Sequence, residues 1–131
     1  MPGTAESVSS TAASPGAPDS SVAQTLTRDG SVSNGRLFAE LKGRPGEQGV
    51  PDGMKVDQEG NVYCTGPNGI WTYDQNGRFL GRIVTPEVPA NLAWGDADWR
   101  TLYITARTSL YRLRTSVPGI PVGVAAMRVP D

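Results

Sequence analysis

The sequence predicts an all-β fold made of short strands joined by tight turns. Sixteen glycines and eleven prolines occur among the 131 residues, and both residue types interrupt helices and favour turns. Several connections are of the hairpin type: Glu59-Gly60-Asn61, Pro67-Asn68-Gly69 and Asn76-Gly77. The apolar segments between the turns lie at 54–57, 62–65, 70–73 and 79–84. This pattern predicts a four-stranded antiparallel meander.

The meander pattern recurs after 40 residues (105 − 65 = 40). The matching pairs are Val62-Tyr63 with Leu102-Tyr103, Thr65 with Thr105, and Ile70-Trp71 with Leu110-Tyr111. An interval of roughly 40–50 residues with several short strands is typical of β-propeller blades. The second unit is expected to have strands at 92–94, 102–105 and 110–113. Pro118 and Pro121 follow, and since proline cannot donate to a sheet ladder, this unit is predicted to lack its outer strand.

Both units begin with a polar residue before an apolar strand. Asp52, after Pro51 and before Gly53, opens the first unit, and Asn91 opens the second at a similar offset (91 − 52 = 39). Aspartate and asparagine are common turn residues, so a structural role is one interpretation of each. The alternative is a site formed where the two units begin, with side-chain oxygens directed to the same channel.

The N-terminal region differs in composition from the rest. Residues 1–28 are rich in Ser, Ala, Gly, Pro and Thr, which offer too little apolar surface to offset the entropic cost of ordering. We expect a disordered tail over 1–28 and a partial β domain over 29–131. A strand is expected at 35–41, as the outer strand of a preceding blade and without a partner upstream.

Charge and residue content exclude several classes of site. Twelve Lys and Arg balance thirteen Asp and Glu, so neither nucleic acid nor a membrane surface is an expected partner. Histidine is absent and Cys64 is the single cysteine, which excludes Cys/His zinc sites, Ser-His-Asp triads and disulfides within the chain. A metal would need oxygen ligands. No basic segment precedes an apolar run, and we expect a cytoplasmic location.

Several motifs in order resemble the senescence-marker-protein/gluconolactonase family, which includes regucalcin. The resemblance covers about 30–115, and its motifs are Pro51-Asp52-Gly53-Met54, Val56-Asp57, Gly60-Asn61-Val62-Tyr63, Thr65-Gly66, Pro86-Glu87-Val88-Pro89-Ala90-Asn91-Leu92-Ala93 and Leu102-Tyr103-Ile104-Thr105-Ala106-Arg107-Thr108-Ser109-Leu110-Tyr111-Arg112. It implies a six-bladed propeller with a metal in its central channel, of which this chain would contain about two blades.

The resemblance also implies an activity, the metal-dependent hydrolysis of a sugar lactone or related ester. Asp52 falls on the family's proline-aspartate-glycine motif, which implies that it binds a divalent cation and orients or deprotonates the attacking water. Calcium is the first expectation for this cation, with zinc, magnesium and manganese as alternatives. Asn91 is a candidate for binding the substrate, with capping of its strand as the alternative.

The chain departs from the family in length and in its metal ligands. Family members are about twice as long or more, and their other ligands, a glutamate and a second asparagine, have no counterpart here. One carboxylate cannot hold a cation that prefers six to eight oxygens. We therefore expect a truncated member that is inactive or nearly so alone, with self-association through its exposed sheet edges. The alternatives are a non-enzymatic protein-binding module and a degenerate product.

Other residues have mainly structural interpretations. Asp57 and Asp74 are expected to make turns and Cys64 to be a small buried side chain. Arg107 is expected to be a strand-face charge, with contact to a ligand as the alternative. Aromatic residues are expected to pack between sheets, with carbohydrate stacking as the alternative for Trp94 or Trp99. The aromatic set is Trp71, Tyr73, Trp94, Trp99, Tyr103 and Tyr111.

Overall fold

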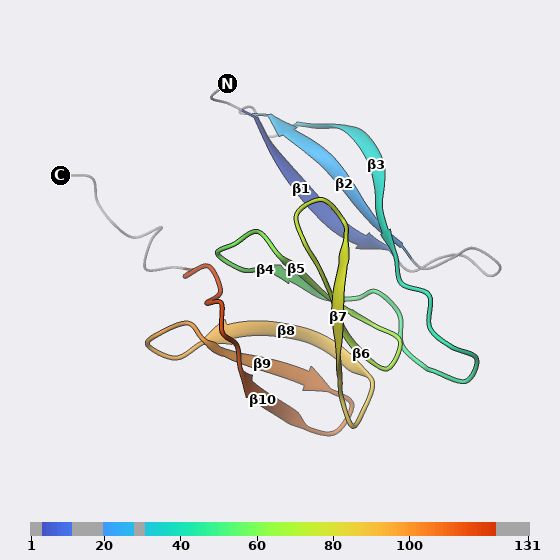
Figure 1. Ribbon diagram of the computed structural model, residues 1–131, viewed down its shortest axis with the longest axis vertical. Coiled ribbons are helices and arrows are strands. Elements are labelled where there is room, and N and C mark those ends of the chain that lie inside the picture. Colours follow the sequence, from blue (N-terminus) through green and yellow to red (C-terminus); the bar gives the residue numbers. More distant parts are fainter. Residues whose placement is uncertain (1–3, 12–19, 28–30, 123–131) are drawn as a thin grey trace.

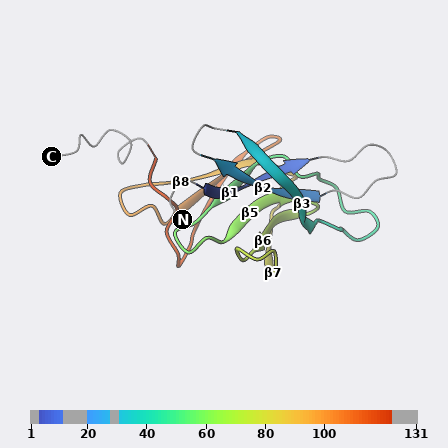
Figure 2. The ribbon, with the colours of Figure 1, turned by 90° about the horizontal axis from the view of Figure 1, so that it is seen from above.

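The computed structural model describes residues 4–11, 20–27 and 31–122. This part of the chain consists of strands and loops (Figures 1 and 2), arranged in three antiparallel sheets with the orders β1-β2-β3, β4-β5-β6-β7 and β10-β9-β8. Among the described residues, no helix long and apolar enough to cross a membrane is found. The all-β prediction is confirmed.

The first predicted unit is a four-stranded meander. Its strands are β4 (Met54–Val56), β5 (Val62–Gly66), β6 (Gly69–Tyr73) and β7 (Phe79–Val84). Two of its turns have the same hydrogen-bond pattern. The side chain of Asp57 accepts hydrogen bonds from the backbone N–H of Glu59 and Asn61, and that of Asp74 accepts them from Asn76 and Arg78, at 2.9 Å in each case. The turn-making roles of Asp57 and Asp74 are thus confirmed.

The second unit has three strands, β8 (Pro89–Gly95), β9 (Thr101–Ala106) and β10 (Leu110–Arg114). The predicted lack of an outer strand is therefore confirmed within the described residues. After β10 the chain crosses back to the first sheet, where Gly119 forms a β-bridge with Asp57 and Gln58 N donates to Pro118 O at 2.9 Å. This proline-containing segment joins the two units instead of extending the second.

The N-terminal region corrects two expectations. β1 (Thr4–Thr11) and β2 (Ser20–Thr27) are strands within 1–28, and β2 pairs with β3 (Val32–Glu40). The predicted strand at 35–41 thus begins earlier and has an upstream partner. Threonine and valine recur in both segments, and these β-branched residues favour extended backbone. The expectation of disorder was based on low overall hydrophobicity and did not take this strand preference into account. The rest of the predicted tail, 1–3, 12–19 and 28, lies outside the described residues.

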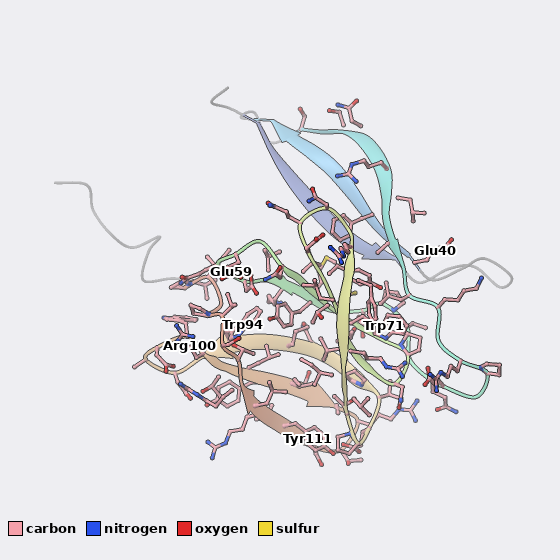
Figure 3. The ribbon with its side chains drawn as sticks, in the orientation of Figure 1. Glu40, Glu59, Trp71, Trp94, Arg100 and Tyr111 are labelled. Atoms are coloured by element: carbon pink, nitrogen blue, oxygen red, sulfur yellow. The ribbon has the colours of Figure 1, made fainter. Side chains whose placement is uncertain are left out.

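Two apolar clusters hold the sheets together (Figure 3). One joins β3 to the four-stranded sheet, and the other lies between the four-stranded and three-stranded sheets. Tyr63 and Trp94 meet edge to face across the second interface, with ring centroids 4.8 Å apart. Burial confirms the packing roles of Cys64 and Trp94, whose exposed fractions are 0% and 8%. Of the other aromatic residues, Trp71, Tyr73, Trp99 and Tyr111 pack in or against these clusters. Tyr103 instead donates a hydrogen bond to Asp96 at 2.7 Å.

We expect all four tyrosines to ionise above their ordinary pKa of 10.0. Burial raises the pKa of Tyr63 and Tyr73 to about 12, with a further contribution from the Asp57 charge for Tyr63. Hydrogen bonds to carboxylates raise the pKa of Tyr103 and Tyr111. Because the folded chain retains these protons more strongly than the unfolded chain, the associated stability is complete below pH 10 and declines as the pH rises toward 12.

Tyrosinate absorbance, measured against pH on the folded chain and in denaturant, checks this prediction. The denatured chain should titrate as one population near pH 10. A folded chain in which Tyr63 and Tyr73 also ionise there would contradict it.

Candidate functional site

The predicted site residues lie at one end of the two C-terminal sheets. In an antiparallel meander, alternate connections lie at the same end, so the chain entering β4 and β8 shares an end with the β5–β6 and β9–β10 turns. Asp52 and Asn91 lie where β4 and β8 begin, and Arg107 lies in the β9–β10 turn. The aspartate-containing turns at 57–61 and 74–78 lie at the opposite end.

Thr65 on β5 holds the backbone of the Asp52 turn. Its hydroxyl oxygen accepts hydrogen bonds from the backbone N–H of Asp52 at 3.1 Å and of Gly53 at 3.0 Å. The N–H of Thr65 in turn donates to the carbonyl oxygen of Gly53 at 2.9 Å. Thr65 is fully buried, at 0% exposure, whereas Asp52 is exposed. A buried hydroxyl thus positions an exposed carboxylate.

Asn91 lies directly against this turn. A Cβ added to Gly53 would come within 2.2 Å of Asn91 Oδ1 and 2.8 Å of Asn91 Cα. Only glycine therefore fits at position 53 without displacing Asn91. Its Oδ1 also accepts a hydrogen bond from Leu92 N at 2.9 Å, so part of the strand-capping interpretation of Asn91 is confirmed. The structure thus places Asn91 against the glycine that follows Asp52.

The register corrects the offset between the two units. Thr65 hydrogen-bonds Gly53, and the equivalent Thr105 is paired with Asn91 and donates to its carbonyl oxygen at 3.3 Å. Asn91 therefore corresponds to Gly53 and not to Asp52, an offset of 38 (91 − 53 = 38). The stretch from Asn91 to Thr105 is two residues longer than that from Gly53 to Thr65 (105 − 91 = 14; 65 − 53 = 12), which accounts for the changed offset.

Two neighbouring cavities lie at this end of the sheets. The first, here named the Asp52 cavity, has a volume of about 310 Å³ and is lined by Gly49, Val50, Asp52, Val88, Pro89, Ala90, Ala106 and Arg107. The second, here named the Glu87 cavity, has a volume of about 430 Å³ and is lined by Gly46, Glu47, Gln48, Asn68, Thr85, Pro86, Glu87, Val88 and Arg107. Val88 and Arg107 line both, so the cavities adjoin along these residues.

The carboxylates of the Glu87 cavity are held by groups other than Arg107. Glu47 forms a bidentate ion pair with Arg82, at 2.8 and 3.1 Å, and this pair lowers the pKa of Glu47. Glu87 accepts hydrogen bonds from the hydroxyls of Thr108 and, at 2.9 Å, Tyr111, and these bonds lower its pKa. Both side chains are therefore negatively charged at neutral pH.

The described residues do not by themselves form a metal centre. Within 4–11, 20–27 and 31–122, no group of three or more His, Cys, Asp or Glu side chains is placed to hold a metal ion. Asp52 and the neighbouring Asn91 offer one carboxylate and one amide, fewer oxygens than calcium takes. The oxygen donors among these described residues do not fit a complete divalent-cation site.

Sequence reasoning missed Thr65 and Glu87 as parts of this region. Thr65 is matched by Thr105 in the repeat, and both are polar residues within apolar strands. This repeated polar position was the signal that could have identified Thr65 as part of the site. Glu87 has no comparable signal, because its hydrogen-bond partners Thr108 and Tyr111 lie more than 20 residues away.

Successive antiparallel meanders of four and three strands are typical of the blades of a β-propeller. Residues 16–108 match the model of the SMP-30/gluconolactonase/LRE-like region, and the chain belongs to this family. It is 37% identical over 76 residues to the gluconolactonase of Zymomonas mobilis, covering 56% of this chain and 21% of that protein. It is 37% identical over 79 residues to pentonolactonase XacC of Haloferax volcanii, covering 58% of this chain and 26% of that protein.

A solved gluconolactonase structure from Xanthomonas campestris is also similar. It has a TM-score of 0.65 and 30% identity, over 83% of this chain and 33% of that one. The chain thus spans about a fifth to a third of the length of these relatives. The prediction of two blades of a β-propeller is confirmed.

Proposed function

We propose that this chain supplies part of the active site for hydrolysis of a sugar lactone or a related cyclic ester. The observation that carries the proposal is the contact of Gly53 with Asn91, which places Asn91 against the turn that carries Asp52, a residue that lines the Asp52 cavity. Membership of a family with lactonase relatives supports the reaction class.

In this proposal Asp52 acts as the general base. Its carboxylate accepts a proton from water while the water oxygen bonds to the lactone carbonyl carbon. The ring C–O bond then breaks, and the proton passes to the departing alkoxide to give an open-chain hydroxy acid. Asn91 Oδ1 accepts a hydrogen bond from Leu92 N, so in this proposal Asn91 would bind a substrate hydroxyl through its amide N–H groups.

A divalent cation remains part of the proposal, with Asp52 as one of its ligands and with calcium ahead of zinc, magnesium and manganese. When bound it would supply Lewis-acid polarisation. Because the described residues do not complete such a site, we assign no step to the metal and expect low turnover from this chain alone. The cytoplasmic location also remains a prediction.

Asp52→Asn provides the test, with Glu59→Gln, an exposed carboxylate at the opposite end of the same sheet, as the matched control. Hydrolysis of glucono- and pentonolactones is followed by acid release, with and without each cation and with chelator. We expect Asp52→Asn to reduce the enzyme-dependent rate about 100-fold or more and Glu59→Gln to leave it unchanged. Equal rates for wild type and Asp52→Asn would exclude the proposed role.

A second candidate is a non-enzymatic module that binds a protein strand, including one of a second copy. It is favoured by the outer edge of β10, which has no partner strand within the described residues, and by the 65% exposure of Leu110 on that strand. Sedimentation of the purified chain distinguishes the two functions. A stable complex together with undetectable lactone hydrolysis would favour the module.

A further inference from the structure

Arg107 lies where the two cavities meet, in the β9–β10 turn and not on a strand face as expected. The β9–β10 turn that carries it is short and closed by a hydrogen bond from Ala106 N to Ser109 O at 3.0 Å. Its side chain lines both the Asp52 cavity and the Glu87 cavity. A short, closed turn thus places Arg107 in the lining of the cavity that Asp52 also lines.

The charge of Arg107 is not neutralised by the groups around it. Within the part of the chain that the structure describes, no ion pair joins Arg107 to a carboxylate; those found are Arg82 with Glu47 and Arg114 with Asp98. The two glutamates of the Glu87 cavity are held by Arg82, Thr108 and Tyr111. The guanidinium therefore retains its hydrogen-bond donors for a group that enters the cavities.

The linings of the two cavities differ in chemistry. Val50, Pro89 and Ala90 give the Asp52 cavity an apolar wall, whereas Gln48 and Asn68 give the Glu87 cavity amide donors and acceptors. A guanidinium binds carboxylates in a bidentate manner, and amides hydrogen-bond hydroxyl groups. The combination suits a ligand with one carboxylate and several hydroxyls.

We propose that Arg107 is an anion-binding residue that receives the carboxylate of an open-chain polyhydroxy acid, the product class of lactone hydrolysis. The inference rests on the proposed function for the choice of ligand. A lactone is uncharged, whereas its hydrolysis product is an anion at neutral pH, so Arg107 distinguishes the product from the substrate by charge.

The test is calorimetric titration of the complete 131-residue chain with gluconate and with glucitol, a neutral polyol of the same carbon count, at constant ionic strength. Arg107→Gln removes the charge and Arg107→Lys retains it. Arg78→Gln is the matched control. Arg78 is an exposed arginine in the β6–β7 turn of the four-stranded sheet, at the end opposite to the cavities. Thermal unfolding of each variant verifies that it is folded.

We expect gluconate to bind the wild-type chain at least tenfold more tightly than glucitol. Hydrogen bonds between the guanidinium and a carboxylate raise the affinity by about tenfold or more, and glucitol cannot form them. Arg107→Gln should lose about tenfold in gluconate affinity, Arg107→Lys should lose less, and Arg78→Gln should be unchanged. Equal affinity for gluconate and glucitol, absence of gluconate binding, or unchanged binding by Arg107→Gln would overturn the inference.

The measurement contains no lactone and requires no turnover. A chain that binds gluconate through Arg107 but whose lactone hydrolysis is unchanged by Asp52→Asn would refute the proposed activity but not this site. An active chain whose gluconate binding is insensitive to Arg107→Gln would refute this site but not the activity.

Discussion

Replacing Thr65 by valine is expected to lower the free energy of unfolding by about 2–4 kcal/mol. Valine has nearly the same shape as threonine but cannot accept a hydrogen bond, and at 0% exposure no water can take the place of the hydroxyl. The buried N–H of Gly53 and the part-buried N–H of Asp52 would both lose their acceptor. Each unsatisfied buried group costs about 1–3 kcal/mol.

The same change should displace the Asp52 turn more than it disturbs the sheet. Chemical denaturation measures the stability loss, and the backbone amide resonances of 52 and 53 report the displacement. Thr65→Ser restores the acceptor and should recover most of the stability and the wild-type resonances. If serine did not rescue, the lost hydrogen bonds would not be the cause.

Thr105→Val is the matched control. Thr105 occupies the equivalent position in the second unit, but it is exposed and its hydroxyl donates one bond to Asn91 O. Its loss should cost no more than about 1 kcal/mol. Similar losses at positions 65 and 105 would contradict the proposed dependence on burial.

Replacing Asp57 by alanine is expected to lower the free energy of unfolding by about 3–5 kcal/mol. Asp57 is 1% exposed, and its carboxylate accepts hydrogen bonds from Glu59 N, Asn61 N and Asn61 Nδ2 at 2.9 Å each. Bonds to a charged acceptor contribute more than neutral ones. The turn also carries the β-bridge between Asp57 and Gly119, so its loss should loosen the join between the two sheets.

Asp74→Ala separates the effect of burial from that of the turn. Asp74 makes the same pair of backbone hydrogen bonds in an exposed turn. We expect this change to cost about 1 kcal/mol. Thermal and chemical unfolding of both variants provide the comparison. An equal loss for the two would show that burial and the Gly119 bridge contribute nothing at Asp57.

Much of the fold could be predicted because its signals are local. Glycine and asparagine mark turns, and alternating apolar segments mark the strands of the two C-terminal sheets; both signals lie within a few residues of the elements they specify. The 40-residue repeat then predicted the equivalent strands (110 − 70 = 40). The signal failed at β1 and β2, where β-branched residues occur without a marked apolar face.

The candidate site could be predicted only in part. The proline-aspartate-glycine motif identified Asp52, and the repeat identified Asn91, although the longer stretch between Asn91 and Thr105 makes Asn91 equivalent to Gly53. The roles of Thr65 and Glu87 depend on side chains separated by more than ten residues. Composition and periodicity contain no information on such contacts.

The sequence by itself determined the strands, the turns and the carboxylate that precedes β4, because backbone preference and alternation of apolar residues act over short distances. Only the tertiary structure decided that Thr65 holds the Asp52 turn, that Gly53 packs on Asn91, and that Arg107 lies between two cavities. These relations arise when the two sheets pack together through Ile70, Leu92 and Trp94. Packing fixes distances between residues that the chain order leaves far apart.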